Sequence, residues 1–211
     1  AKLFGQGVLG IHQNDVVHSA AKLFFAYGLG NAMTFPLSVG ATSILWPPRP
    51  TPDGVLEIMG KYRPSIFYAV PSLFIALLSH PDIGKGLGSD RLRLCVSAGE
   101  ALPAHIGERW REVVGVDVLD GIGSTELLHI FLSNAPGDIK YGSSGRPVPG
   151  TYAPEAELLA IADVMRGAGH GVFEAIVAGT IGELRRLGGE RAQPLDEVPL
   201  LATLGRVSGR P

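Results

Sequence analysis

The sequence predicts an α/β fold in which helices flank a parallel-stranded sheet. Short apolar segments typical of strands alternate with segments of helical periodicity, and Pro or Gly stands at most of the junctions. With 45% hydrophobic and 18% charged residues, a chain of 211 residues can bury a substantial core. Its 29 glycines and 16 prolines are spread along the chain, as expected for many short loops.

The first strand and helix signals lie in the first third of the chain. Residues 41–46 form a strand candidate that ends at a proline-rich stretch. Thr51 can then cap a helix that has Pro52 in its first turn. A second apolar strand candidate, 65–70, is followed by Pro71, which can open the next helix.

The alternation continues to residue 120. Residues 91–97 predict a third strand, 103–114 a helix with one apolar face, and 116–119 a fourth strand. Ligands of parallel α/β sheets bind at the carboxyl ends of strands. The loops 97–103 and 120–126 both follow strands, so we expect a site between them.

The pattern of strand and helix signals along the sequence changes after residue 150. We therefore predict two domains, at 1–150 and 151–211, the second a helix-rich α/β tail. The elements expected in the tail are one helix, one strand and two further helical stretches, at 155–168, 171–176, 179–190 and 194–207.

Composition excludes several classes of function. The net charge of −2 gives no reason to expect a nucleic-acid partner. Neither a signal peptide nor an apolar run long enough to span a bilayer is visible, so we expect a cytoplasmic protein without membrane contact. Cys95, in an alternating apolar segment, is interpreted as a small core residue. The histidines at 12, 18, 80, 105 and 170 have no metal-ligand spacing.

The segment Asp120-Gly121-Ile122-Gly123-Ser124-Thr125-Glu126 is the strongest candidate for chemistry. Glycines let a backbone approach phosphate, and hydroxyls donate hydrogen bonds to phosphate oxygens. A carboxylate such as that of Glu126 suits Mg²⁺, which prefers hard oxygen ligands. Taken alone, a glycine-rich turn that opens a helix is more often structural.

Four ordered blocks of sequence, at 21–31, 95–103, 120–134 and 141–150, favour a functional interpretation of this segment. They read AKLFFAYGLGN, CVSAGEALP, DGIGSTELLHIFLSN and YGSSGRPVPG. Together they resemble the adenylate-forming acyl–coenzyme A ligases, and most of all the benzoate–coenzyme A ligases. The resemblance implies that residues 1–150 are part of the AMP-binding N-terminal domain of such a ligase.

The resemblance also implies roles for individual residues. Thr125 would contact the ATP phosphates and Glu126 would hold Mg²⁺, and these two are the catalytic candidates. Nucleotide binding would fall to Gly99, Glu100, Asp120 and Thr125. The acyl group would be surrounded by Ala26, Tyr27, Ala98, Gly123, His129 and Ile130.

Two of these residues have an ordinary structural alternative. His129 could be a hydrogen-bonded structural histidine, and the resemblance favours a pocket residue near the carboxylate instead. Tyr27 could be a core aromatic residue. The acid itself stays open, because benzoate, hydroxybenzoates and aminobenzoates differ by small changes around Ala26, Gly123 and Ile130.

The resemblance implies a reaction that uses ATP, Mg²⁺ and coenzyme A. A carboxylate and ATP give an acyl-adenylate and pyrophosphate, and coenzyme A then displaces AMP to give the thioester. The 211 residues contain no Ser/Thr/Gly-rich, lysine-ending phosphate loop, no downstream ribose-binding aspartate and no C-terminal domain with its catalytic lysine. We therefore expect little turnover from this chain alone. Self-association, or a companion chain that supplies the missing parts, is the alternative.

Residues 151–211 resemble, more weakly, part of an N-acyl-D-amino-acid deacylase of the amidohydrolase class. The segments 157–160 and 169–174 carry that resemblance. No family metal ligands lie among them, and an amidohydrolase-type deacylase fragment is therefore the third interpretation. A mis-joined reading frame and a genuine fusion both remain open for the junction near 148–150.

Overall fold

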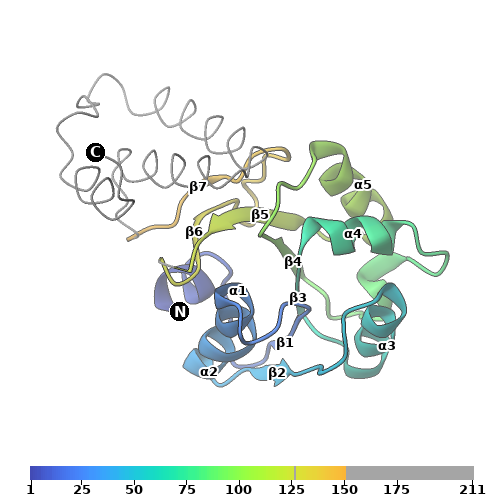
Figure 1. The fold of residues 1–211 in the computed structure, drawn as a ribbon, viewed down its shortest axis with the longest axis horizontal. Coiled ribbons are helices and arrows are strands. Elements are labelled where there is room, and N and C mark those ends of the chain that lie inside the picture. Colours follow the sequence, from blue (N-terminus) through green and yellow to red (C-terminus); the bar gives the residue numbers. More distant parts are fainter. Residues whose placement is uncertain (126, 151–211) are drawn as a thin grey trace, which may run out of the picture. The chain divides into compact units, whose positions relative to one another are not determined.

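The computed structural model describes residues 1–125 and 127–150. The strands of this part form one sheet in the order β2-β1-β3-β4-β5-β6-β7 (Figure 1). Their bounds are β1 Val16–Ser19, β2 Thr42–Ile44, β3 Ile66–Ala69, β4 Leu94–Ser97, β5 Val118–Gly123, β6 Ile130–Ser133 and β7 Arg146–Pro147. Strands β1 to β5 pair in parallel, whereas β6 and β7 are antiparallel additions.

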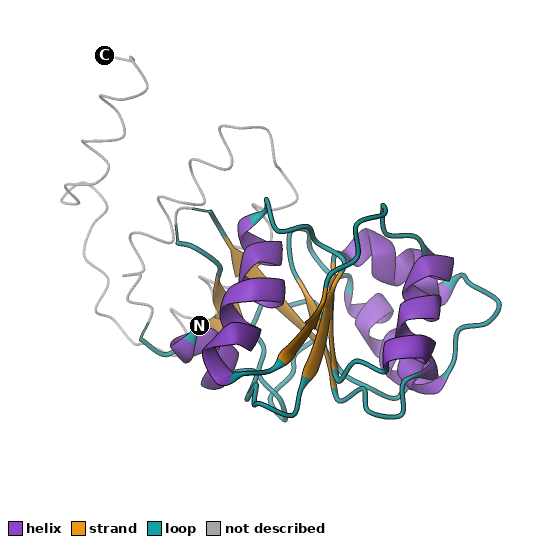
Figure 2. Ribbon diagram, turned by 90° about the horizontal axis from the view of Figure 1, so that it is seen from below, coloured by secondary structure: helices purple, strands orange, loops and turns teal. Residues whose placement is uncertain are grey.

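The helices cover both faces of the sheet (Figure 2). The α-helices are α1 Ala26–Leu29, α2 Phe35–Val39, α3 Pro52–Tyr62, α4 Pro71–Leu78 and α5 Ala104–Val114. Shorter turns are the π-helical η1 Lys2–Gln6 and η2 Gly30–Thr34 and the 3-10 turn η3 Lys85–Gly88. Helices α3, α4 and α5 lie on one face, and α1, η2 and α2 lie on the other.

Alternation along the central strands divides the core into two clusters. In β3, Phe67 packs toward α4, where Phe74 meets the Trp110 ring edge-on at 4.7 Å between centroids. The neighbouring Tyr68 faces the opposite cluster with Phe35. Side chains that alternate between two covered faces explain why the whole strand is apolar.

The sequence prediction of an α/β sheet with flanking helices is confirmed. The four predicted strands correspond to β2, β3, β4 and β5, and the three predicted helices to α3, α4 and α5. Thr51 caps α3 as expected, since its hydroxyl accepts a hydrogen bond from the Gly54 N–H at 3.2 Å. Cys95 is buried in the core, and burial raises the pKa of its thiol.

The sheet contains more than the sequence predicted. Strands β1, β6 and β7 were not expected. Residues 120–123 belong to β5 rather than to the predicted loop 120–126, because they pair with β4 and β6. The interpretation of the glycine-rich turn as a helix opening is also wrong, because β6 follows it. The elements predicted for 155–168, 171–176, 179–190 and 194–207 lie outside the described residues, as does Glu126. No helix in the described part is both long and apolar enough to cross a membrane.

An ion pair between the buried Asp15 and the partly exposed Arg93 joins the beginnings of three neighbouring strands. Asp15, which precedes β1, is 1% exposed and accepts hydrogen bonds from Arg93 Nη2 at 2.7 Å and Ser65 Oγ at 2.7 Å. Ser65 precedes β3 and Arg93 precedes β4. Burial by itself would raise the pKa of the Asp15 carboxyl, but hydrogen bonds from Arg93 and Ser65 lower it below its usual value.

Replacing Arg93 with Ala should therefore destabilise the chain by about 3 kcal/mol at pH 7, because a buried carboxylate is left without its cation. Urea unfolding measures this loss. The matched control is Arg63→Ala, which breaks an exposed pair with Asp90 and should change the stability little. Equal losses for the two variants would contradict the importance of burial at Asp15.

Candidate acyl-binding site

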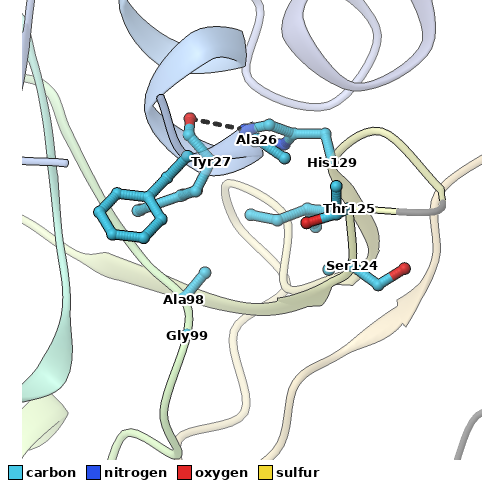
Figure 3. A pocket seen from close by; sticks show the side chains of 10 residues that line it. Ala26, Tyr27, Ala98, Gly99, Ser124, Thr125 and His129 are labelled. Atoms are coloured by element: carbon cyan, nitrogen blue, oxygen red, sulfur yellow. Dashed lines mark hydrogen bonds between the residues drawn. The ribbon is translucent and has the colours of Figure 1, made fainter. Parts of the chain in front are cut away.

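A cavity of about 170 Å³ lies at the carboxyl ends of β4 and β5, beside the start of α1 (Figure 3). Three segments far apart in the sequence supply its walls. They contribute, in chain order, Phe25, Ala26, Tyr27, Ala98, Gly99, Gly123, Ser124, Thr125, His129 and Ile130. The position agrees with the general rule that α/β sheets bind ligands where their strands end.

The predicted site residues are distributed unevenly around this cavity. All six acyl-binding candidates line it, namely Ala26, Tyr27, Ala98, Gly123, His129 and Ile130. Of the nucleotide-binding candidates, Gly99 and Thr125 line it as well. Glu100 and Asp120 are not among its lining residues, and Glu126 lies outside the described residues.

Two lining residues were not predicted. Phe25 and Ser124 stand next to the predicted Ala26 and Thr125 in the sequence. The motifs that contain these two residues are recognisable in the sequence. The pattern of apolar and polar residues, however, does not predict which residue of a loop faces a cavity. Ser124 also accepts a hydrogen bond from the Leu127 N–H at 3.2 Å through its hydroxyl, which orders the turn between β5 and β6.

Gly123 is a glycine because backbone passes close by. A Cβ atom at this position would lie 2.6 Å from the carbonyl oxygen of His129 and 2.8 Å from the nitrogen of Ile130. The pairing register between β5 and β6 shifts at the same place, between Ile122 and Gly123. The irregular pairing thus brings His129 and Ile130 against the end of β5 and shapes one wall of the cavity.

Tyr27 forms a fixed wall of the cavity. Its hydroxyl donates to the carbonyl oxygen of Val96 at 2.9 Å and also lies 3.3 Å from that of Ala69. Burial raises the pKa of the phenol well above its usual value, so the hydroxyl stays protonated. The hydrogen bond ties α1 to the ends of β3 and β4, and the ring offers an uncharged aromatic surface.

His129 is held on several sides. Its Nε2 lies 3.1 Å from the carbonyl oxygen of Tyr27, drawn as the dashed line in Figure 3. Its ring centroid is 4.6 Å from that of Phe35, edge-on, and 5.5 Å from those of Phe4 and Tyr27. Burial lowers the pKa of His129 to about 4, so the ring is neutral at pH 7.

Asp120 lies in β5 with its side chain buried at 4% exposure. The Ser144 hydroxyl approaches its Oδ2 at 3.5 Å, and Asn134 donates to its backbone carbonyl. Burial raises the pKa of the Asp120 carboxyl to about 7. This carboxyl therefore titrates near neutral pH, which is unusual for an aspartate.

A second cavity of about 580 Å³ adjoins the first. Both are lined by Phe25, Tyr27, Ala98 and Gly99, and the second extends to Lys22, Arg49, Thr51 and the start of α4. Lys22 Nζ donates to the carbonyl oxygens of Trp46 and Pro48, which fixes the proline-rich wall. Within the described residues, no three His, Cys, Asp or Glu side chains come together as a metal-binding group.

Comparison with known proteins gives a consistent result. Residues 2–154 match the family model described as AMP-binding enzyme. The benzoate–CoA ligase of Thauera aromatica is 59% identical over 150 residues, which are 71% of this chain and 28% of that protein. The 4-hydroxybenzoate–CoA/benzoate–CoA ligase of Rhodopseudomonas palustris is 53% identical over 142 residues, 67% of this chain and 26% of that one.

Solved structures agree. A benzoate CoA ligase from Burkholderia xenovorans LB400 superposes with a TM-score of 0.69 at 56% identity, over 71% of this chain and 30% of that one. An anthranilate CoA ligase in complex with anthranoyl-AMP gives a TM-score of 0.66 at 46% identity, over 71% and 29%. The chain thus spans a little over a quarter of the length of the curated relatives it matches.

Proposed function

Because this chain belongs to the AMP-binding enzyme family, we propose that residues 1–150 form the aryl-acid pocket of a benzoate-like coenzyme A ligase. One observation carries the proposal. Six residues drawn from three distant segments, which the family resemblance nominated for the acyl group, line a single cavity. Residues that serve only packing within separate elements are not expected to meet around one cavity.

The dimensions and chemistry of the cavity support an aromatic guest. An engineered apolar cavity of roughly 150 Å³ is known to bind benzene, and this one measures about 170 Å³. Ala98 and Gly123 are small residues and leave space for a flat ring, while Tyr27 and His129 contribute uncharged rings to the lining. Ligand sites of this kind are mostly apolar with a few polar anchors.

Ser124 and Thr125, which are adjacent in the sequence, bring hydroxyl groups to the lining of the cavity. We assign the carboxylate end of the acid to the side that they line. In the proposed reaction, the carboxylate of the acid attacks the α-phosphate of ATP and releases pyrophosphate. The thiol of coenzyme A then displaces AMP from the acyl-adenylate and gives the thioester. Thr125 would donate a hydrogen bond to the phosphates, and the adjoining cavity offers room for the larger part of either co-substrate.

Mg²⁺ would offset the phosphate charge when bound. Its proposed ligand is Glu126, next to Thr125 in the sequence. The exposed Glu100, whose carboxylate accepts a hydrogen bond from Ser72 at 3.5 Å, stays a proposal for the nucleotide site together with Asp120 and Gly99. The relatives are named for benzoate, hydroxybenzoate and anthranilate, so an unsubstituted or singly substituted benzoate is the proposed acid class.

A thermal melt of the purified chain with a stable benzoyl-adenylate mimic tests the pocket. At about 100 times its dissociation constant, the mimic should add roughly 2.7 kcal/mol to the stability of the native state. The control is Gly123→Ala, whose methyl group collides with the cavity wall and should abolish the upward shift. A cooperative melt that the mimic leaves unchanged would contradict the proposal.

A further inference from the structure

Gly30, the first residue of η2, lies directly against the His129 ring. It is buried, and a Cβ atom built on it would lie 2.2 Å from Cδ2 and 2.6 Å from Nε2 of His129. Neither distance is compatible with a real contact. Any side chain at position 30 must therefore push the imidazole away from its present place.

The place of the ring determines its hydrogen bond. The carbonyl oxygen of Tyr27 can only accept, so the His129 nitrogen that lies 3.1 Å from it must carry the proton. A neutral imidazole has one N–H, and Nδ1 is then a bare acceptor, buried and without a partner among the described residues. Phe4 and Phe35 pack on the ring and oppose its rotation.

We propose that Gly30 is a positioning residue for the aryl pocket, which acts by seating His129 as a single Nε2–H tautomer. This inference rests on the proposed function, since Gly30 would set the position of a side chain that lines the same cavity. With its N–H already donated to Tyr27, the imidazole has no proton to offer a carboxylate. It adds an uncharged ring to the lining of the cavity, which Ala98 also lines (Figure 3).

Ligand affinity in four forms of the full 211-residue chain tests this mechanism. These are the wild type, Gly30→Ala, His129→Ala and the double variant, titrated calorimetrically with the benzoyl-adenylate mimic. Gly30→Ala should weaken binding by about 10-fold to 100-fold, the size of effect that one misplaced group in a pocket produces. In the His129→Ala background, the same methyl group fills vacated space and should change affinity little. An equal loss in both backgrounds would overturn the proposal.

Nitrogen-15 spectra of the imidazoles supply a readout that does not need the ligand. In the wild type, His129 should show an Nε2–H signal and an unprotonated Nδ1 from pH 8 to pH 5. Gly30→Ala should shift these signals, whereas Gly60→Ala, an exposed helix position with open space around its Cβ, should not. If the wild type fails to bind the mimic, the proposed function fails, and these spectra still decide whether Gly30 seats His129. Unchanged His129 signals in Gly30→Ala would overturn the proposal.

Discussion

Replacing Asp120 with Asn should stabilise the folded chain by about 3 kcal/mol more at pH 8 than at pH 5. Burial raises the pKa of this carboxyl from 3.8 to about 7. The folded chain therefore takes up the proton at a higher pH than the unfolded chain does. Ionised Asp120 costs stability above pH 7, and the cost fades as the pH falls toward 3.8. Asparagine cannot ionise, so the variant lacks this dependence.

Urea unfolding of wild type and Asp120→Asn at the two pH values measures the difference. The control is Asp82→Asn, which changes an exposed carboxylate in the loop after α4 and should show no such contrast. Any constant loss from placing an amide at position 120 cancels when the two pH values are compared. A difference between variant and wild type that is the same at pH 8 and pH 5 would contradict the prediction.

The two buried histidines have the opposite effect on the pH dependence of stability, because they favour the folded chain at higher pH. Burial lowers the pKa of His18 and of His129 from 6.5 to about 4, so the unfolded chain binds their protons first on acidification. Each contributes about 3 kcal/mol of stability that is present above pH 6.5 and lost by pH 4. Proton uptake by Asp120 offsets part of this loss in the wild type. Asp120→Asn removes the offset, so the free energy of unfolding of the variant should fall more steeply between pH 8 and pH 5 than that of the wild type.

A polypeptide of these 211 residues alone should form benzoyl–coenzyme A no faster than a protein-free control. It corresponds to a little over a quarter of the ligases it resembles, and its sequence contains no lysine-ending phosphate loop. Positioning and charge stabilisation supply most of the acceleration in phosphoryl and acyl transfer, so their loss should cost many orders of magnitude.

A coupled assay for AMP release, with chromatographic detection of the thioester, tests this expectation. A full-length benzoate–coenzyme A ligase serves as the positive control. Thioester formation above background in the purified chain would contradict the prediction. Turnover that arises only when a second polypeptide with a phosphate loop is added would instead make this chain one subunit of a split enzyme.

The helices α3, α4 and α5 were predictable because their signals are local. Thr51-Pro52, Pro71 and Pro103 mark their starts, and each carries an apolar face. Strand β1 was not predictable, because a buried His18 interrupts a short apolar segment. Strand β6 was missed because Leu127-Leu128-His129-Ile130 suits a helix equally well, and only pairing with β5 decides between the two.

The residues of the candidate site could be nominated from motifs, but their geometry could not. Nothing in the sequence places Gly30 against His129, because that contact joins η2 to the turn before β6. Likewise, the burial that raises the pKa of Asp120 depends on packing around the end of β5. Motifs name residues, whereas distances and ionisation depend on segments that meet only in the folded chain.

The walls of the candidate cavity are expected to come together late in folding, because they are distant in the sequence. His129 and Tyr27, which are bonded across the cavity, stand 102 positions apart in the sequence. Closing so long a loop is costly, so this contact is expected to form after the local β3-α4-β4 pairing. A ligand that needs the completed cavity should then leave the refolding rate nearly unchanged and lower the unfolding rate. Ligand binding would therefore be seen as a longer lifetime of the native state.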